Sequence, residues 1–585
     1  MTDTARAASP AMAVGRAPST WRLLRGQFRY CTKSFWRTPV AAFFTLVFPL
    51  SFLVVICAIA GNATIDSRSG VRLAQFLTPV FAVFGACMAA FVSLALGVAY
   101  DREAGVLKRL RSTPLPPWIH LAGRVGAAVW VSLIAFALVT VVGVALYGVQ
   151  IVWHTLPATV LTFVVGVGCF AALGLAVVSL APTPGSTQAL ANGGLILLAF
   201  ISDVFVVALP QWLDRVGWFF PLKHFVNAVA DTFNPNLADN GPAWDHLGVL
   251  VAWGIVGALV ALRMFTWEPR TARSARRRGH VGDARAEPTV DGPTVAVTST
   301  PSVASLTAAV AGRPRSWWSL AWGQSRFTTT KLLRDPLSMF FAVAFPAILL
   351  VFFSVSYGQD ARWGGLPLPQ YLAAVFSVYG VAAMSYINLS SAVAQDRSTL
   401  VLKRLRGTPL PPGAYLAGRI GGAMLLGALT VVVVFGLGAA LFGVRLGAAA
   451  LVMTAVTFMV IIGCATALGL LLASLLDSPQ SVTAAALATL LPLAMVSDIF
   501  INSAELPATM SAIGWAFPLR HMSAIAVAAS SGQGLSAGWW QHLAVVALWG
   551  LAAALVTSRI FRWEPRTAHA RHHHRPVSSA AASSE

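Results

Sequence analysis

Long runs of apolar residues recur along the whole chain, separated by short polar and basic segments. Six runs in each half are long enough to cross the hydrocarbon core of a bilayer as helices. They lie at residues 39–60, 75–100, 119–148, 157–181, 187–208 and 245–266, and again at 336–357, 370–395, 414–443, 449–475, 481–501 and 538–560. The pattern predicts an all-α polytopic membrane protein with about twelve transmembrane helices.

The second half of the chain repeats the first. The segment DREAGVLKRLRSTPLPP at residues 101–117 returns at 396–412 as DRSTLVLKRLRGTPLPP. Other matched positions keep the same order: Phe48-Pro49 with Phe345-Pro346, Gly168-Cys169 with Gly463-Cys464, Ser202-Asp203 with Ser497-Asp498, and 267–271 with 563–567. An even number of spans per copy makes the two six-helix repeats parallel, related by an axis along the membrane normal. Both termini are then expected in the cytoplasm.

The repeats set the expected domain limits. The predicted parts are a cytoplasmic amino-terminal tail at 1–20, a first repeat at 21–271, a linker at 272–315, a second repeat at 316–567 and a cytoplasmic carboxyl-terminal tail at 568–585. The linker has no helical or strand periodicity, which is typical of a flexible segment. It is too short to hold a nucleotide-binding domain.

Composition agrees with a membrane protein and narrows its chemistry. Hydrophobic residues make up 57% of the 585 residues and charged residues 11%, which is too little polar surface for a soluble globule of this size. The net charge of +20 comes from basic residues in short loops and tails, the positive-inside pattern, so we expect a lipid bilayer as partner and no nucleic acid. The chain lacks a Gly-Lys dipeptide and hence a Walker A loop.

Metal and redox chemistry are not expected. The five cysteines have no metal-ligand or redox spacing, and most of them lie within apolar runs, where they are interpreted as packing residues. Three adjacent histidines at 572–574 lie in a tail and are not expected to form a closed metal site. We expect no cofactor and no enzymatic activity in this chain.

A basic amphipathic helix is predicted before the first span. Its apolar positions recur at helical spacing and its basic positions occupy another face: Trp21, Leu24, Phe28 and Phe35 against Arg22, Arg25, Arg29 and Lys33. The second copy has a less regular version with Trp318, Trp322, Arg326, Lys331 and Arg334. The helix is either an elbow that also touches a partner or a simple positive-inside anchor.

The repeated segments 101–117 and 396–412 are predicted to hold a short helix that packs leucines, exposes cations and ends at a Thr-Pro pair. Such a helix at the bilayer surface is suited to docking a partner. The alternative is that the charges only set topology, although their repetition at the same place in both halves favours docking.

Two aromatic segments, GWFFPLKH at 217–224 and GWAFPLRH at 514–521, precede the last span of each copy. Irregular backbone at membrane depth survives only against protein or a wet cavity, so they are candidates for an outer gate. The candidate gate residues are Asp203, Phe220, Pro221, Asp498, Phe517 and Pro518. The alternatives are an aromatic interfacial belt with snorkelling cations and, for the two aspartates, helix caps.

These features resemble the type 2 permeases of ABC exporters, especially those of the daunorubicin-resistance kind, over both halves of the chain. The pattern of that family, Glu-x-Gly-x-Leu-x-x-Leu-x-x-x-Pro, is met by Glu103, Gly105, Leu107, Leu110 and Pro114. The second copy has Ser398 and Leu400 in place of the first two, so its docking is expected to be weaker. The resemblance implies coupling to an ATPase through Glu103, Gly105, Leu107, Leu110, Arg111, Pro114, Leu402, Leu405, Arg406 and Pro409.

The resemblance further implies that two permease units are fused and recruit a separate ABC ATPase, in two copies, that binds ATP and magnesium. The expected function is export of a small hydrophobic or amphipathic compound, an antibiotic, another drug or a lipid, across the plasma membrane. Few charges within the spans agree with an apolar cargo. The alternatives are a proton-coupled multidrug antiporter of the major facilitator type and an ATPase-coupled membrane sensor or scaffold.

Overall fold

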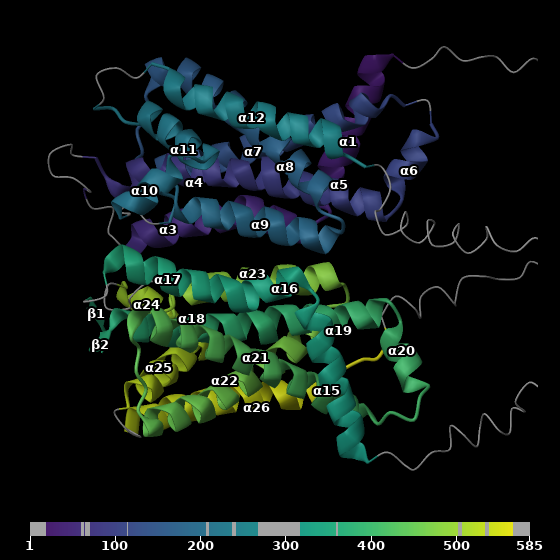
Figure 1. The fold of residues 1–585 in the computed structure, drawn as a ribbon, viewed down its shortest axis with the longest axis vertical. Helices are drawn as coiled ribbons and strands as arrows, with labels where there is room; N and C mark the ends of the chain where they lie inside the picture. Colours follow the sequence, from purple (N-terminus) through teal and green to yellow (C-terminus); the bar gives the residue numbers. More distant parts are fainter. Residues whose placement is uncertain are drawn as a thin grey trace, which may run out of the picture.

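The chain forms two helical halves that lie side by side, one from each repeat (Figure 1). The computed structural model describes residues 19–59, 64, 71–113, 115–205, 210–236, 241–266, 316–358, 361–500, 506–532 and 537–564. The predicted linker, the carboxyl-terminal tail and all but the end of the amino-terminal tail lie outside these residues. Within them the one sheet is a hairpin of two short strands, β1 (Arg362–Trp363) and β2 (Leu366–Pro367).

The first half consists of an elbow helix, six long helical segments and three short helices. In chain order these are α1 (Thr20–Trp36), α2 (Pro39–Ala42), α3 (Phe48–Ile59), α4 (Leu73–Cys87), α5 (Leu94–Glu103), α6 (Val106–Arg111), α7 (Pro117–Tyr147), α8 (Leu156–Leu180), α9 (Pro184–Phe200), α10 (Gln211–Gly217), α11 (Pro221–Thr232) and α12 (Trp244–Met264). A 3₁₀ turn, Trp153–Thr155, precedes α8. Two π-helical turns, Phe43–Val47 and Met88–Ser93, join α2 to α3 and α4 to α5.

The second half repeats this order. Its helices are α15 (Trp317–Leu333), α16 (Pro336–Met339), α17 (Phe345–Tyr357), α18 (Leu368–Ala382), α19 (Leu389–Ser398), α20 (Val401–Arg406), α21 (Pro412–Phe442), α22 (Ala448–Leu475), α23 (Pro479–Met495), α24 (Ala508–Ala516), α25 (Pro518–Ser531) and α26 (Ala537–Ile560). The π-helical turns return at Phe340–Ala344 and Ala383–Asn388. The predicted all-α fold with two repeats is therefore confirmed.

Helices occupy all twelve predicted span positions, but not all reach the predicted ends. Nine described helices are long and apolar enough to cross a membrane, and shorter apolar helices include 43–58 and 479–495. The predicted spans 187–208 and 481–501 were too long, because α9 ends at Phe200 and α23 at Met495. Hydropathy alone missed these ends, because most of the residues that follow them are also apolar. Asp203 and Asp498 have left-handed backbone conformations, with φ 59° and 61°, and an α-helix cannot continue through such a residue.

The start of the fifth span is fixed by local chemistry that is the same in both halves. The Thr183 hydroxyl accepts a hydrogen bond from the backbone N–H of Ser186 at 3.2 Å, and the Ser478 hydroxyl accepts one from Ser481 at 3.0 Å. Pro184 then occupies the first helical position, where a missing N–H costs nothing. These caps set where α9 and α23 enter the bundle.

The fifth span of each half packs against the start of the first span of the other. Helix α9 contacts α16, and α23 contacts α2. The exchange is reciprocal, as a pseudo-twofold arrangement requires. Aromatic rings fill the seam, with the Phe200 ring centroid 6.4 Å from that of Phe345.

Candidate functional site

The two predicted docking segments form short helices, α6 and α20, at one end of the bundle (Figure 1). Each begins after a residue in the left-handed conformation, Gly105 with φ 69° in the first half and Leu400 with φ 61° in the second. Glycine has no β-carbon to oppose this conformation, whereas leucine is strained there. The glycine of the family pattern is thus explained by backbone geometry, and its loss in the second copy leaves the geometry unchanged.

The strain predicts opposite stability changes at these two positions. We expect Leu400→Gly to raise the free energy of unfolding by about 1 kcal/mol and Gly105→Ala to lower it by about the same amount. Nothing lies within 4 Å of a β-carbon placed on Gly105, so its effect comes from the backbone alone. Thermal unfolding of the purified chain in detergent measures both shifts; equal shifts of one sign would contradict this origin.

Within α6 and α20 the leucines and cations separate as predicted. Leu107 and Leu402 are fully buried at 0% exposure, and Leu110 and Leu405 are half-buried. The exposed positions are Glu103, Lys108, Arg109, Lys403, Arg404, Arg406 and Pro409. Pro114 lies outside the described residues, and the structure describes Arg111 only as the last residue of α6. Each helix therefore presents a basic outer face and is fastened to the bundle by leucine.

An arginine just before each short helix ties it to the fourth span. Arg102, 2% exposed, donates hydrogen bonds to the carbonyl oxygens of Val178 at 2.9 Å and Ala181 at 2.7 Å, at the end of α8. In the second half the Arg397 guanidinium donates to the carbonyl oxygen of Leu476, just past α22. A guanidinium satisfies the carbonyls that a helix end leaves without partners. These hydrogen bonds connect the residue before α6 to the end of α8, and the residue before α20 to the end of α22.

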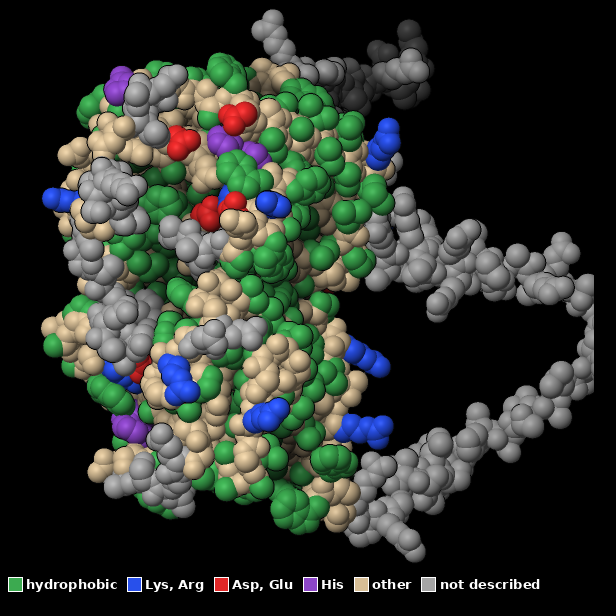
Figure 2. Space-filling view, turned by 60° about the vertical axis from the view of Figure 1, so that its left-hand side comes forward, with side chains coloured by type: hydrophobic (Ala, Val, Ile, Leu, Met, Phe, Trp, Pro, Cys, Tyr) green, Lys and Arg blue, Asp and Glu red, His purple; other side chains and the backbone are tan. Residues whose placement is uncertain are grey.

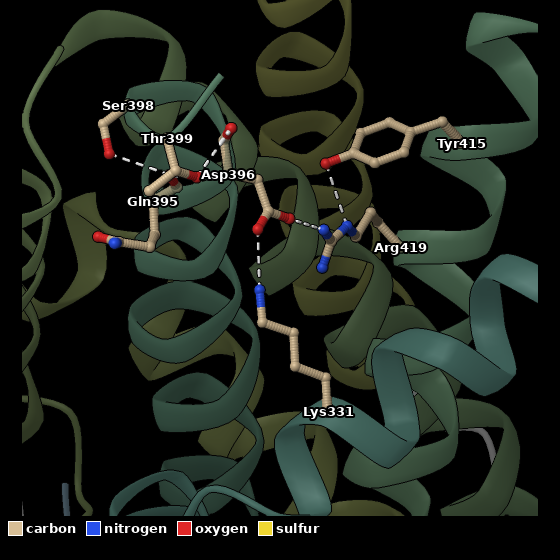
Figure 3. Close-up of polar contacts among 7 residues, drawn as sticks. All are labelled: Lys331, Gln395, Asp396, Ser398, Thr399, Tyr415 and Arg419. Atoms are coloured by element: carbon tan, nitrogen blue, oxygen red, sulfur yellow. Dashed lines mark hydrogen bonds and ion pairs between the residues drawn. The ribbon is translucent and has the colours of Figure 1, made fainter. Parts of the chain in front are cut away.

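The aspartate beside each of these arginines pairs with the third span. Asp101 pairs with Arg124 of α7, and Asp396 pairs with Arg419 of α21. In the second half Asp396 also accepts a hydrogen bond from Lys331 of α15 at 2.8 Å (Figure 3). Figure 3 shows the Asp396 carboxylate between the two cations, with the Arg419 Nε donating to the Tyr415 hydroxyl at 3.1 Å. One carboxylate thus links the elbow, the second span and the third span.

The predicted gate segments form helical pairs at the opposite end of the bundle, α10 with α11 and α24 with α25 (Figure 1). Phe220 and Phe517 are the N-cap residues of α11 and α25, and the buried Pro221 and Pro518 are the first residues of these helices. Neither Asp203 nor Asp498 caps the next described helix, because α10 and α24 have Pro210 and Pro507 as N-caps.

The two aspartates instead pair with a buried cation of the second described helix after them, α11 or α25. Asp203 lies 2.9 Å from the Nζ of Lys223, which also pairs with Asp214, and Asp498 lies 3.3 Å from the Nε of Arg520. Burial raises the pKa of Asp203 above its usual value, while the hydrogen bond and charge of Lys223 oppose that rise. Figure 2 shows the charged and histidine side chains gathered on this end of the first half. The pairs fix the turn after each fifth span to α11 or α25.

A histidine pair joins α11 to α12 and recurs between α25 and α26. The Nδ1 atoms of His224 and His246 lie 2.8 Å apart, as do those of His521 and His542. His224 Nε2 lies 2.7 Å from the carbonyl oxygen of Trp218, so it carries the proton, and a neutral His224 accepts at Nδ1 from His246. Neither histidine pair was foreseen from the sequence.

A large cavity, with a volume of about 1130 Å³, is lined by residues of both halves. Both halves contribute aromatic rings to it, among them Phe44, Phe48, Phe52, Phe200, Phe205, Phe341, Phe345, Phe353, Tyr379 and Phe500. Several of these lie on or beside the π-helical turns of the first span. At the end near α6 and α20 the lining is polar and includes Asp101, Arg124, Lys331, Asp335 and Gln395. The cavity is therefore amphipathic along its length.

None of the six predicted gate residues is among those that line the cavity. Phe205 and Phe500, two positions beyond the aspartates, line it instead. Sequence analysis also missed the roles of Arg102, Arg397 and the aspartates beside them. The sequence did contain a signal for these roles. In both repeats an Asp-Arg pair occurs at the same place, and a second arginine follows the aspartate by 23 residues.

Comparison with protein families agrees with this architecture. Residues 62–263 match an ABC-2 family transporter protein model, and residues 316–529 match an ABC-2 type transporter model. No curated protein matches the chain. The chain therefore belongs to the ABC-2 transporters and carries two of their membrane domains in one polypeptide, as a fused type 2 ABC permease does.

Domains of this class are membrane transport components rather than catalytic domains, and they imply a partnering ABC ATPase. The protein is accordingly a multi-pass membrane protein and a permease subunit. The match favours this class over the major facilitator alternative. The daunorubicin-resistance subtype stays a prediction.

Proposed function

We propose that the chain exports a small hydrophobic or amphipathic compound, an antibiotic, another drug or a lipid, using ATP hydrolysed by a separate subunit. The observation that carries this proposal is the central cavity of about 1130 Å³ with aromatic walls and a polar inner end. Apolar pockets of this kind, with few convergent polar groups, are typical of binding sites for small organic ligands. The apolar body of the cargo lies among the rings and its polar group faces the inner end.

The ATPase docks on α6 and α20 in two copies, with ATP and magnesium bound on that subunit. The support is the exposed basic face of each helix and its buried leucine, Leu107 or Leu402. The protein lies in the plasma membrane. The basic residues favour a cytoplasmic position for the end of the bundle that carries α6 and α20, with both termini on that side. A scaffold or sensor has no need of a cavity of this size, so transport is the better interpretation.

Flux measurements in vesicles test this function. Outward flux of a fluorescent hydrophobic drug is expected only when the chain is reconstituted with a partner ABC ATPase and ATP is added. Cavity variants with an added charge, such as Phe48→Glu, are expected to lower the flux at least tenfold, because a lone charge among aromatic rings opposes binding of an apolar body. The exposed Lys108→Glu change on α6 separates a docking defect from a cavity defect, because it should weaken ATPase binding and leave drug binding intact.

Flux driven by a proton gradient without the ATPase would contradict the proposal and support an antiporter. ATP hydrolysis by the complex without any drug flux would support the sensor.

A further inference from the structure

A second, smaller cavity opens at the seam between the halves and is wholly apolar. Its volume is about 310 Å³, and it is lined by Trp212 and Leu213 of α10, Ala347, Ile348, Val351, Phe352 and Val355 of α17, and Leu437 of α21. We call it the seam groove. Helix α10 lies at the end of the bundle away from α6 and α20, so the groove lies at the depth of the outer leaflet (Figure 1). An apolar surface at this depth on spans α17 and α21 is suited to contact with lipid.

One layer of aromatic rings separates the seam groove from the central cavity. Phe200 of α9 lines the central cavity, and Phe352 of α17 lines the groove. Their ring centroids lie 4.8 Å apart, a direct contact. The next residue, Phe353, lines the central cavity and lies 6.1 Å from Phe200. A change of side-chain rotamer at this contact would join the two spaces.

At the described positions that match these two rings in the repeat, the other seam has no aromatic residue. The positions of the other seam that match Phe200 and Phe352 in the repeat hold Met495 and Val55. Trp212 and Ile348 are likewise matched by Thr509 and Ser51. The two repeats therefore supply matching helices at both seams but aromatic side chains at one, which distinguishes this seam as a path for an apolar body.

We propose that the seam groove is a lateral exit through which the apolar body of the cargo passes from the central cavity into the outer leaflet, with Phe200 and Phe352 as its gate. This inference rests on the proposed export function. The cargo then leaves through one seam only, and it must be a compound that partitions into hydrocarbon. The polar group of such a cargo would move along the side of the seam that faces α10.

A reversible cross-link tests the gate. The chain carrying Phe200→Cys and Phe352→Cys is reconstituted in vesicles with the ATPase, and flux of a fluorescent hydrophobic drug is measured after oxidation and again after reduction. The two new cysteines replace rings that are in direct contact, which favours a disulfide between them. We expect oxidation to lower flux at least tenfold and reduction to restore it. Unchanged flux in protein shown to be cross-linked would overturn the exit.

A bulk exchange provides a second test that does not depend on forming the disulfide. Phe200→Met with Phe352→Val gives the first seam the side chains of the second, and Met495→Phe with Val55→Phe does the reverse. The first pair is expected to lower drug accumulation at least fivefold while ATP hydrolysis persists, and the second pair to change it less than twofold. Equal effects at both seams would overturn the assignment. If the unaltered chain shows no ATP-dependent flux, the export function itself fails and the exit with it.

Discussion

Replacing Asp396 with Asn is expected to lower the stability of the second half by about 3–5 kcal/mol, because it removes the only acidic group that the structure shows paired with Lys331 and Arg419. The Arg419 side chain is 2% exposed, so water cannot replace the lost carboxylate, and the two cations are left to repel one another. The change should appear as a lower apparent melting temperature of the purified chain in detergent.

The repeat supplies matched controls for this prediction. Residue Ser34 of the first half corresponds to Lys331, so the structure pairs Asp101 with one cation, Arg124, and Asp396 with two. Asp101→Asn should therefore cost less than Asp396→Asn. Adding Lys331→Ser to Asp396→Asn should recover part of the loss, because it removes one of the two repelling charges. A double variant less stable than the single one would show that Lys331 contributes by packing rather than by charge.

Replacing Arg102 with Met is expected to lower ATP-driven drug flux at least tenfold while ATP hydrolysis and drug binding are kept. The guanidinium joins the residue before α6 to the carbonyl oxygens of Val178 and Ala181, and methionine has no donor for them. The two orphaned carbonyls would then cost about 1–3 kcal/mol each in stability, so expression and melting temperature are measured alongside flux.

Lys108→Met is the control for Arg102→Met, because it removes a cation from the exposed face of the neighbouring helix α6 without touching a backbone carbonyl. It should reduce ATPase binding and leave the ratio of drug moved to ATP hydrolysed unchanged. Arg397→Met, which breaks the corresponding link to Leu476, should lower that ratio as Arg102→Met does. If both arginine variants lower flux and hydrolysis in equal proportion, Arg102 serves docking rather than transmission.

The sequence predicted those site residues that belong to a motif repeated along the chain. It did not predict those that meet only through contacts between distant segments. Leu107 and Leu402 followed from helical spacing within a repeated motif, and the structure buries both. The seam could not be foreseen, because Phe200 and Phe352 belong to different repeats and meet only when the halves pack. Hydropathy places apolar residues in the membrane but does not distinguish a lipid-facing phenylalanine from one that lines a cavity.

The sequence by itself determined the approximate spans, the internal repeat, the elbow helices, the short helices after the second spans and the class of protein, because each depends on periodicity or on residues close together in the chain. The tertiary structure decided which side chains share a cavity, which carboxylates meet which cations, and where the fifth spans end. These features depend on contacts between segments from about 20 to 150 residues apart, or on a backbone conformation such as that of Asp203, that no hydropathy pattern records.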